Sequence, residues 1–220
     1  MNETNARHIE NGVRMVDPAA TYIDETVEIA KGVTIYPNAV LEGACVIEAG
    51  AYIGPGAHLK DVHVGPNAKI HSYSVLTDAE VGADTNVGPF AYLRGNAVIG
   101  KRCRIGSFVE IKKSRVGDDT NAAHLAYIGD ATVGCNVNIG CGVITANYDG
   151  KTKSRTIIND NAFIGSNVNL IAPVEVGEWG YIAAGSTIYE SIPDDSFAIA
   201  RGKQYTKSDW GKDPRRNAKD

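Results

Sequence analysis

The chain has little of what marks membrane, nucleic-acid-binding or disulfide-stabilised proteins. It has four cysteines in 220 residues with no CxxC pair, so neither disulfides nor a metal site is expected. No apolar run approaches the roughly 18 residues that cross a bilayer, and residues 1–16 are too polar for a signal peptide, so we expect a cytoplasmic protein without membrane contact. A formal net charge of -4 offers no basic field, so no nucleic-acid partner is expected.

What the chain does have is a six-residue period in its aliphatic side chains. Between Ile29 and Ile188 there are 27 repeat positions, and 25 of them hold Ile, Leu or Val. These types make up 47 of the 220 residues, so chance would fill only about six positions. Glycine often follows the aliphatic residue, as a tight corner requires. A small or β-branched residue stands four positions after the aliphatic one, so the aliphatic and the small side chain can both point inward. The pattern predicts an all-β fold, a parallel β-helix of hexapeptide repeats.

The interruptions of the period predict how many strands make a coil. Four steps have five residues instead of six, and they begin at Leu59, Leu76, Ile111 and Ile128; the one long insertion is 145–157. All five are separated by multiples of three repeats, which predicts triangular coils with every irregularity on one corner. Nine such coils would form a rod roughly 43 Å long at the usual sheet spacing. Irregular corners on a regular scaffold are where functional sites usually lie.

Two cations are predicted beside that corner. Arg94 and Lys112 occupy equivalent positions on adjacent coils, about 5 Å apart. Like charges so placed are unfavourable unless they share an anion, and an arginine fork beside a lysine suits a phosphate. Tyr92, Glu110 and Tyr127 form the neighbouring column. An alternative is therefore a salt-bridged surface in which Glu110 neutralises the cations.

His124 is a candidate general base, because an imidazole can accept a proton near neutral pH. The spacing predicts it in the neighbourhood of Arg94, two coils further on, although a lone histidine is often structural. The polar, glycine-containing segment 145–153 is too long for a corner and is a candidate binding loop. His58, His63 and His71 fall in different columns, so the pattern does not predict a shared zinc ion.

From about Asn11 to Trp210 the chain carries a dense series of more specific motifs. They are Gly88–Arg94, Phe108–Lys113, His124–Asp130, Asn136–Gly140, Thr145–Gly150, Ile164–Ser166, Ala172–Val174 and Ile182–Gly185. With these motifs the chain resembles the C-terminal acetyltransferase domain of the family of bacterial bifunctional N-acetylglucosamine-1-phosphate uridyltransferases and glucosamine-1-phosphate N-acetyltransferases. The resemblance implies a left-handed coil, which the period alone does not determine, and a homotrimer with acetyl-CoA bound between neighbouring prisms.

The resemblance also implies roles for individual residues. His124 would take a proton from the amine of glucosamine 1-phosphate, which would attack the thioester of acetyl-CoA directly and yield N-acetylglucosamine 1-phosphate for UDP-N-acetylglucosamine and cell-wall precursor synthesis. The residues matching sugar-phosphate contacts are Arg94, Lys112, Tyr127 and Asn138. Those matching acetyl-CoA positions are Cys141, Asn147, Tyr148, Ser166, Ala184 and Arg201, with Lys153 at a neighbouring basic position.

The chain departs from the family pattern at Gly95, Ala123 and Cys141, where the family usually has proline, glycine and alanine. It has no glycine-rich nucleotide loop, so uridyl transfer and its magnesium are not predicted. The expected division is a linker remnant at 1–14, the acetyltransferase β-helix at 15–191 and a C-terminal arm and tail at 192–220. Two alternatives remain: a hexapeptide acetyltransferase with another amino-sugar acceptor, and a non-catalytic trimeric scaffold that binds a sugar nucleotide.

Overall fold

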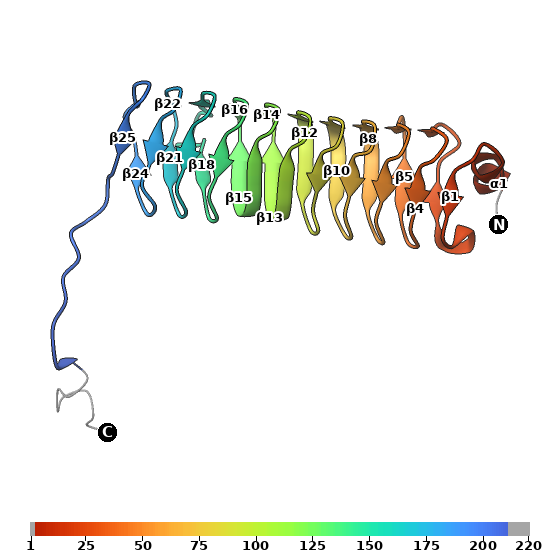
Figure 1. Cartoon of the computed structure of the whole chain (residues 1–220), viewed down its shortest axis with the longest axis horizontal. Coiled ribbons are helices and arrows are strands. Elements are labelled where there is room, and N and C mark those ends of the chain that lie inside the picture. The colour runs from red at the N-terminus through yellow and green to blue at the C-terminus, as the bar shows by residue number, and fades with distance from the viewer. Residues whose placement is uncertain (1–2, 211–220) are drawn as a thin grey trace.

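In the computed structural model, which describes residues 3–210, the chain forms an elongated rod of short parallel strands (Figure 1). A short helix lies at its N-terminal end, and the segment after β25, as far as residue 210, extends away from its C-terminal end (Figure 1). Residues 1–2 of the expected linker and 211–220 of the expected tail lie outside the described residues. No helix within 3–210 has the length and apolar character needed to cross a membrane.

The helices are α1 (Glu3–Glu10) and the 3₁₀ turn η1 (Pro18–Ala20). The strands are β1 (Arg14–Met15), β2 (Tyr22–Ile23), β3 (Glu28–Ile29), β4 (Thr34–Ile35), β5 (Val40–Glu42), β6 (Val46–Ile47), β7 (Tyr52–Ile53), β8 (His58–Val64), β9 (Lys69–Ile70), β10 (Val75–Val81), β11 (Asn86–Val87), β12 (Tyr92–Ile99), β13 (Arg104–Lys112), β14 (Arg115–Val116), β15 (Asn121–Gly129), β16 (Ala131–Val133), β17 (Asn138–Ile139), β18 (Ile144–Ala146), β19 (Thr156–Ile158), β20 (Phe163–Ile164), β21 (Asn169–Ile171), β22 (Val174–Val176), β23 (Tyr181–Ile182), β24 (Thr187–Ile188) and β25 (Phe197–Ala198).

The strand register confirms three repeats per coil. Tyr52 pairs with Lys69, which pairs in turn with Asn86, so one coil takes 17 residues here. The rod has about ten turns instead of the nine predicted. The difference arises at the ends, where β1 pairs with β4 and β25 pairs with β23 although neither lies in the hexapeptide pattern. At the C-terminal end the coil therefore continues to Ala198, beyond the expected boundary at 191.

The interior consists of the two inward columns that the repeat predicts. Aliphatic side chains such as Ile35 and Leu41 alternate with small ones such as Ala39, and all three are completely buried. Small residues stack on small residues from coil to coil, so the aliphatic side chains of each coil fill the interior. Burying the whole aliphatic series supplies most of the driving force for coiling.

The irregular corner is also as predicted. Each of the four shortened steps turns on a single residue with positive φ, namely Asp61, Asp78, Lys113 or Asp130. Such residues close a turn tightly at a modest conformational cost, which Asp tolerates better than most side chains. On the same corner, the long insertion leaves the rod after β18 and returns at β19.

Candidate active site

One face of the prism carries the predicted cations; we call it the cation face. It is built from the first three residues of β12, the second half of β13 and the second half of β15, and it ends at the irregular corner. Arg94 pairs in register with Lys112, and Lys112 with Gly129, which confirms the predicted column. In β15, Gly129 has no side chain at this position, and the ring of Tyr127 occupies the space.

Arg94 forms the ion pair that the sequence offered as an alternative. Its Nε and Nη2 atoms donate to Oε1 of Glu110 at 2.9 and 2.6 Å. This hydrogen bond is the main reason that the pKa of Arg94 is raised above its ordinary value. The guanidinium also lies 5.4 Å from the ring centre of Tyr92. Arg94 is therefore held in place and still partly exposed, so it can offer remaining N–H groups to a ligand.

Lys112 is paired more weakly. Its Nζ lies 3.9 Å from Oδ2 of Asp130, and its side chain is only 12% exposed. Asp130 also accepts a hydrogen bond from Nδ2 of Asn147, at the start of the insertion. A carboxylate shared between a lysine and an amide leaves the lysine free to turn toward an incoming anion. No role was predicted for Asp130 from the sequence, although Asp130 directly follows Gly129, which shares the register position of Arg94 and Lys112.

Tyr127 lies between the cations and His124. A Cβ atom placed on Gly129 would collide with the Tyr127 hydroxyl, so this ring lies over the glycine and beside Lys112. His124 stands five residues before Gly129 in β15, and the chain turns between them at Leu125, which has positive φ. His124 pairs in register with Ser107 of β13. His124 therefore lies at the edge of the cation face opposite the irregular corner, and not on the corner itself.

Three residues predicted to contact acetyl-CoA share the register position of His124 on successive coils, and a fourth, Arg201, lies one position past that register and contacts Ala184; we call these five residues the His124 edge. The members are His124, Cys141, Ser166, Ala184 and Arg201. Neighbouring coils are linked here by three backbone bonds: Gly142 N to Leu125 O at 2.7 Å, Asn167 N to Cys141 O at 2.7 Å and Gly185 N to Ser166 O at 2.8 Å. Nη1 of Arg201 donates to Ala184 O at 2.9 Å and completes the edge. Four coil spacings give a track roughly 19 Å long.

Glycines beside the His124 edge let neighbouring coils pack closely. A Cβ atom on Gly140 would lie 2.5 Å from the backbone nitrogen of Ser166, and one on Gly165 would lie 2.5 Å from that of Ala184. The glycines therefore hold the coils close beside the track. Cys141 is exposed, so its thiol can meet a ligand that lies there. Asn138 lies three residues before Cys141, on the adjoining face.

The insertion carries the other predicted acetyl-CoA contacts. Tyr148 forms an antiparallel bridge with Lys153, and its ring is 58% exposed. Asp149 holds the tip together, because its carboxylate accepts hydrogen bonds from the Lys151 and Thr152 nitrogens at 2.7 Å each. These bonds lower the pKa of Asp149. Because the insertion starts on the irregular corner, the two groups of predicted acetyl-CoA contacts of one chain lie at opposite edges of the cation face.

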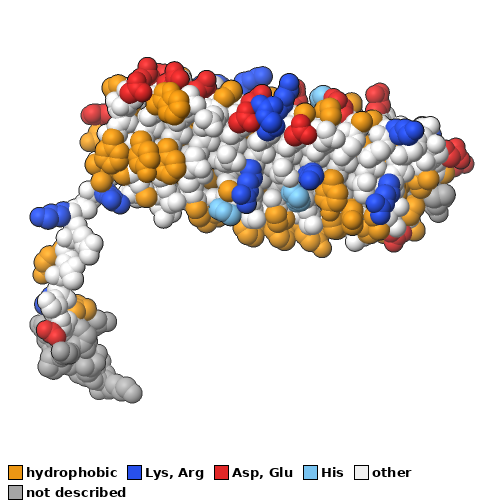
Figure 2. All heavy atoms as spheres, in the orientation of Figure 1, with side chains coloured by type: hydrophobic (Ala, Val, Ile, Leu, Met, Phe, Trp, Pro, Cys, Tyr) orange, Lys and Arg blue, Asp and Glu red, His pale blue; other side chains and the backbone are white. Residues whose placement is uncertain are grey.

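A ladder of exposed large side chains runs along the same edge, toward the N-terminal end. We call Tyr73, Phe90, Phe108 and Leu125 the edge ladder. Its rings stack with centroids 5.5 and 5.4 Å apart, and all four residues have positive φ. Figure 2 shows hydrophobic side chains gathered along the lower edge of the rod. Bulky residues rarely adopt positive φ, and here the conformation directs apolar side chains outward beside His124.

Three histidines outside the site, His58, His63 and His71, have separate local partners. The Nε2 atoms of His58 and His63 lie 2.7 and 2.5 Å from carboxylate oxygens of Glu42 and Glu48. His71 lies 3.3 Å from Oδ1 of Asn86. Across residues 3–210, no three His, Cys, Asp or Glu side chains come together in an arrangement that could hold a metal ion.

The fold of the rod is a left-handed parallel β-helix of hexapeptide repeats. The sequence matches the family "Bacterial transferase hexapeptide (six repeats)" over residues 26–61, 44–78, 78–113 and 155–190. Together these matches cover more than half of the chain. The chain therefore belongs to the bacterial transferase hexapeptide family.

Relatives and solved structures agree with this assignment. The chain is 53% identical to "Bifunctional protein GlmU" of Acetivibrio thermocellus over 93% of its length, and 48% identical to the protein of that name from Brevibacillus brevis over 96%. It spans only 44% and 46% of those two proteins. The solved UDP-N-acetylglucosamine acyltransferase of Campylobacter jejuni shares the fold, with a TM-score of 0.59 and 17% identity over 85% of this chain and 71% of that one.

Proposed function

We propose that this chain transfers the acetyl group of acetyl-CoA to the amine of glucosamine 1-phosphate. The observation that carries the proposal is the His124 edge, a glycine-flanked track that ends at a histidine beside a face with two cations. About half of the residues are identical to bifunctional relatives, which supports the same acceptor. The products would be N-acetylglucosamine 1-phosphate and free coenzyme A.

The cation face is suited to hold the sugar phosphate. Lys112 supplies charge to the phosphate, and Arg94 adds N–H donors while Glu110 keeps its guanidinium in position. Tyr127 lies next to Lys112 and can contact the sugar, and Asn138 can contact it from the adjoining face. Glu110 also limits the net positive charge of the face when no anion is bound.

His124 then serves as the general base. The amine nitrogen attacks the thioester carbonyl, the N–C bond forms and the C–S bond breaks, and coenzyme A leaves as the thiol. His124 takes the proton that the amine must lose, and the leaving sulfur accepts a proton in turn. A backbone N–H group would stabilise the oxyanion of the tetrahedral intermediate. No covalent enzyme intermediate is required.

We further propose that the site is shared between copies in a homotrimer. The insertion begins at the irregular corner and the His124 edge bounds the opposite side of the same face, so a ligand on that edge would meet the insertion of a neighbouring copy packed against it. The edge ladder supports this arrangement, because Phe108 and Leu125 are 62% and 59% exposed beside His124. A second copy of the chain packed against that edge would bury them.

The test is His124→Ala, with His63→Ala as the matched control. Free thiol release from acetyl-CoA and glucosamine 1-phosphate should fall by about a hundredfold or more, with acetyl-CoA binding retained, as loss of a general base requires. His63 is exposed and far from the edge, so its replacement should leave turnover unchanged. Wild-type turnover in His124→Ala would show that His124 is not the general base. Release with another amino sugar only would favour a different acceptor, and no release with any amino sugar would favour the non-catalytic scaffold.

A further inference from the structure

A second row of stacked aromatic rings lies on the face that adjoins the His124 edge. Phe163, Tyr181 and Phe197 each begin a short strand and pair in register from coil to coil. Their ring centroids are 4.6 and 5.7 Å apart, with planes inclined by 10° and 25°. Figure 2 shows a row of hydrophobic side chains near the C-terminal end of the rod. Ring stacking at these spacings is favourable, and a ring at either end of the row has a stacking partner from the row on one side only.

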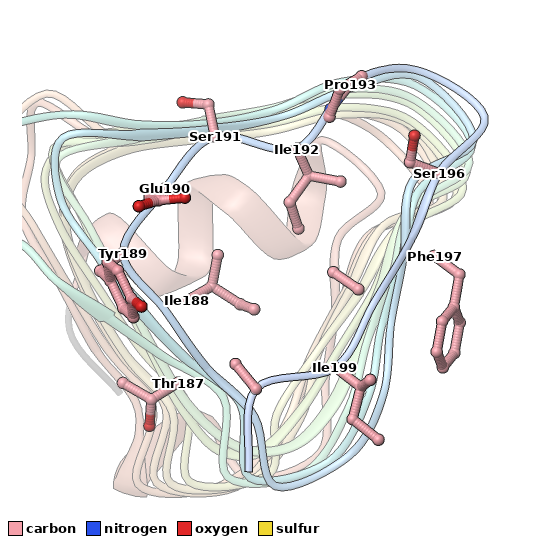
Figure 3. A pocket seen from close by; sticks show the side chains of 12 residues that line it. Thr187, Ile188, Tyr189, Glu190, Ser191, Ile192, Pro193, Ser196, Phe197 and Ile199 are labelled. Carbon is pink, nitrogen blue, oxygen red and sulfur yellow. The ribbon is translucent and has the colours of Figure 1, made fainter.

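The last ring of the row, Phe197, is available to another flat group. It is 63% exposed, and β25 is the final strand of the described sheet on this face. Figure 3 shows its side chain on the outside of the last coil, while Ile188 and Ile192 lie toward the interior. Ile199 follows on the outer side and is 53% exposed. Phe197 and Ile199 therefore form an apolar ledge instead of part of the core.

The ledge leads to the end of the proposed coenzyme A track. Arg201 stands four residues after Phe197, at most about 14 Å along the chain, and its side chain folds back onto Ala184 O. An arginine at this position can bind a phosphate of the donor's nucleotide. The base of the same nucleotide can then reach the ledge, because the ribose joins base and phosphate within that distance.

We propose that Phe197, supported by Ile199, binds the adenine ring of coenzyme A as the next ring of the stack. This inference rests on the proposed function, which makes acetyl-CoA the donor. Stacking on Phe197 would hold the nucleotide end of the donor while Arg201 holds its phosphate. Phe197 is then a residue that selects a nucleotide-linked thioester over a shorter thioester, and it takes no part in the chemistry at His124.

The experiment compares Phe197→Leu, Phe197→Trp and the control Tyr22→Leu, an exposed ring at the other end of the rod. Two donors are used, acetyl-CoA and S-acetyl-4′-phosphopantetheine, which lacks the nucleotide. Phe197→Leu should raise the KM for acetyl-CoA about tenfold, with kcat and the KM of the shorter donor unchanged. Phe197→Trp should keep the wild-type KM for acetyl-CoA or lower it, and Tyr22→Leu should change nothing.

Direct binding of adenosine 3′,5′-bisphosphate, measured by calorimetry, separates this inference from the proposed function. Binding that weakens about tenfold in Phe197→Leu supports the adenine site even if the wild type acetylates no amino sugar. An unchanged KM and unchanged nucleotide binding in an active enzyme would overturn the inference alone. An equal rise of KM for both donors would also overturn it, because it would indicate a change in the track rather than the loss of a stacking partner.

Discussion

Mixing two inactive variants should restore a defined part of the activity, because the proposed site joins two edges from different copies. The first variant is His124→Ala, which removes the base from the His124 edge. The second combines Tyr148→Ala and Lys153→Ala, which alters the insertion at the irregular corner. Each substitution inactivates only the site to which the altered part, the His124 edge or the insertion, contributes. A site formed by an intact His124 edge and an intact insertion should therefore be active, whichever substitutions the rest of the trimer contains.

The structure sets the expected magnitude. If two variants exchange freely at a one-to-one ratio, half of the copies offer an intact His124 and half an intact insertion. In a closed ring each site draws these parts from two copies independently, so about one quarter of the sites should be fully wild type. A mixture of His124→Ala with wild type should instead keep about one half of the activity, because only one partner of each site varies.

The assay is thiol release from acetyl-CoA with glucosamine 1-phosphate, after the variants are refolded together. Differently tagged copies allow the mixed assemblies to be purified before the measurement, and each variant refolded alone gives the background. Activity near the background at every mixing ratio, in assemblies shown to contain both variants, would refute the shared site. It would mean that the insertion and the His124 edge of one chain act together, although they lie at opposite edges of the cation face.

Two further predictions concern the scaffold. Leu93→Ala should lower the free energy of unfolding by about 3 kcal/mol, because Leu93 is completely buried and its removal leaves a cavity, whereas Lys69→Ala on the surface should change it by less than about 0.5 kcal/mol; an equal unfolding midpoint in urea would contradict the packed interior. His8 of α1 is 96% buried, and burial followed by the charge of Arg7 lowers its pKa from 6.5. The unfolded chain therefore binds the proton more readily, so the stability from the neutral imidazole is full above pH 6.5 and is lost as the pH falls below it. Thermal unfolding between pH 7 and 5 should show a midpoint that falls less in His8→Gln than in the wild type, and parallel curves would refute this role.

The hexapeptide period determined the interior of this protein. An aliphatic residue at every sixth position, with a small residue four positions on, leaves few other ways to bury both. The shortened steps at Leu59 and Ile111 then indicated three strands per coil and an irregular corner. These features are local and repeat many times, so one weak repeat, such as the one at Thr145, does not obscure them.

The ends of the rod were less accessible to the same reasoning. β1 and β25 pair with the sheet through backbone bonds that need no aliphatic repeat. Backbone hydrogen bonding leaves no trace in side-chain periodicity, so the two terminal strands went unpredicted. For the same reason the expected boundary at 191 fell short of Ala198.

Some features of the outward-facing residues follow from the sequence, and others only from the tertiary structure. The sequence alone placed Arg94 beside Lys112, because register repeats from coil to coil. Only the tertiary structure decided that Glu110 neutralises Arg94, that Asp130 links Lys112 to the insertion, and that His124 lies on the edge away from the irregular corner. Those outcomes depend on how each corner turns and on where flexible side chains settle, which a count of repeats does not contain. The period therefore determines what lies inside the coil, and the corners decide what meets at its surface.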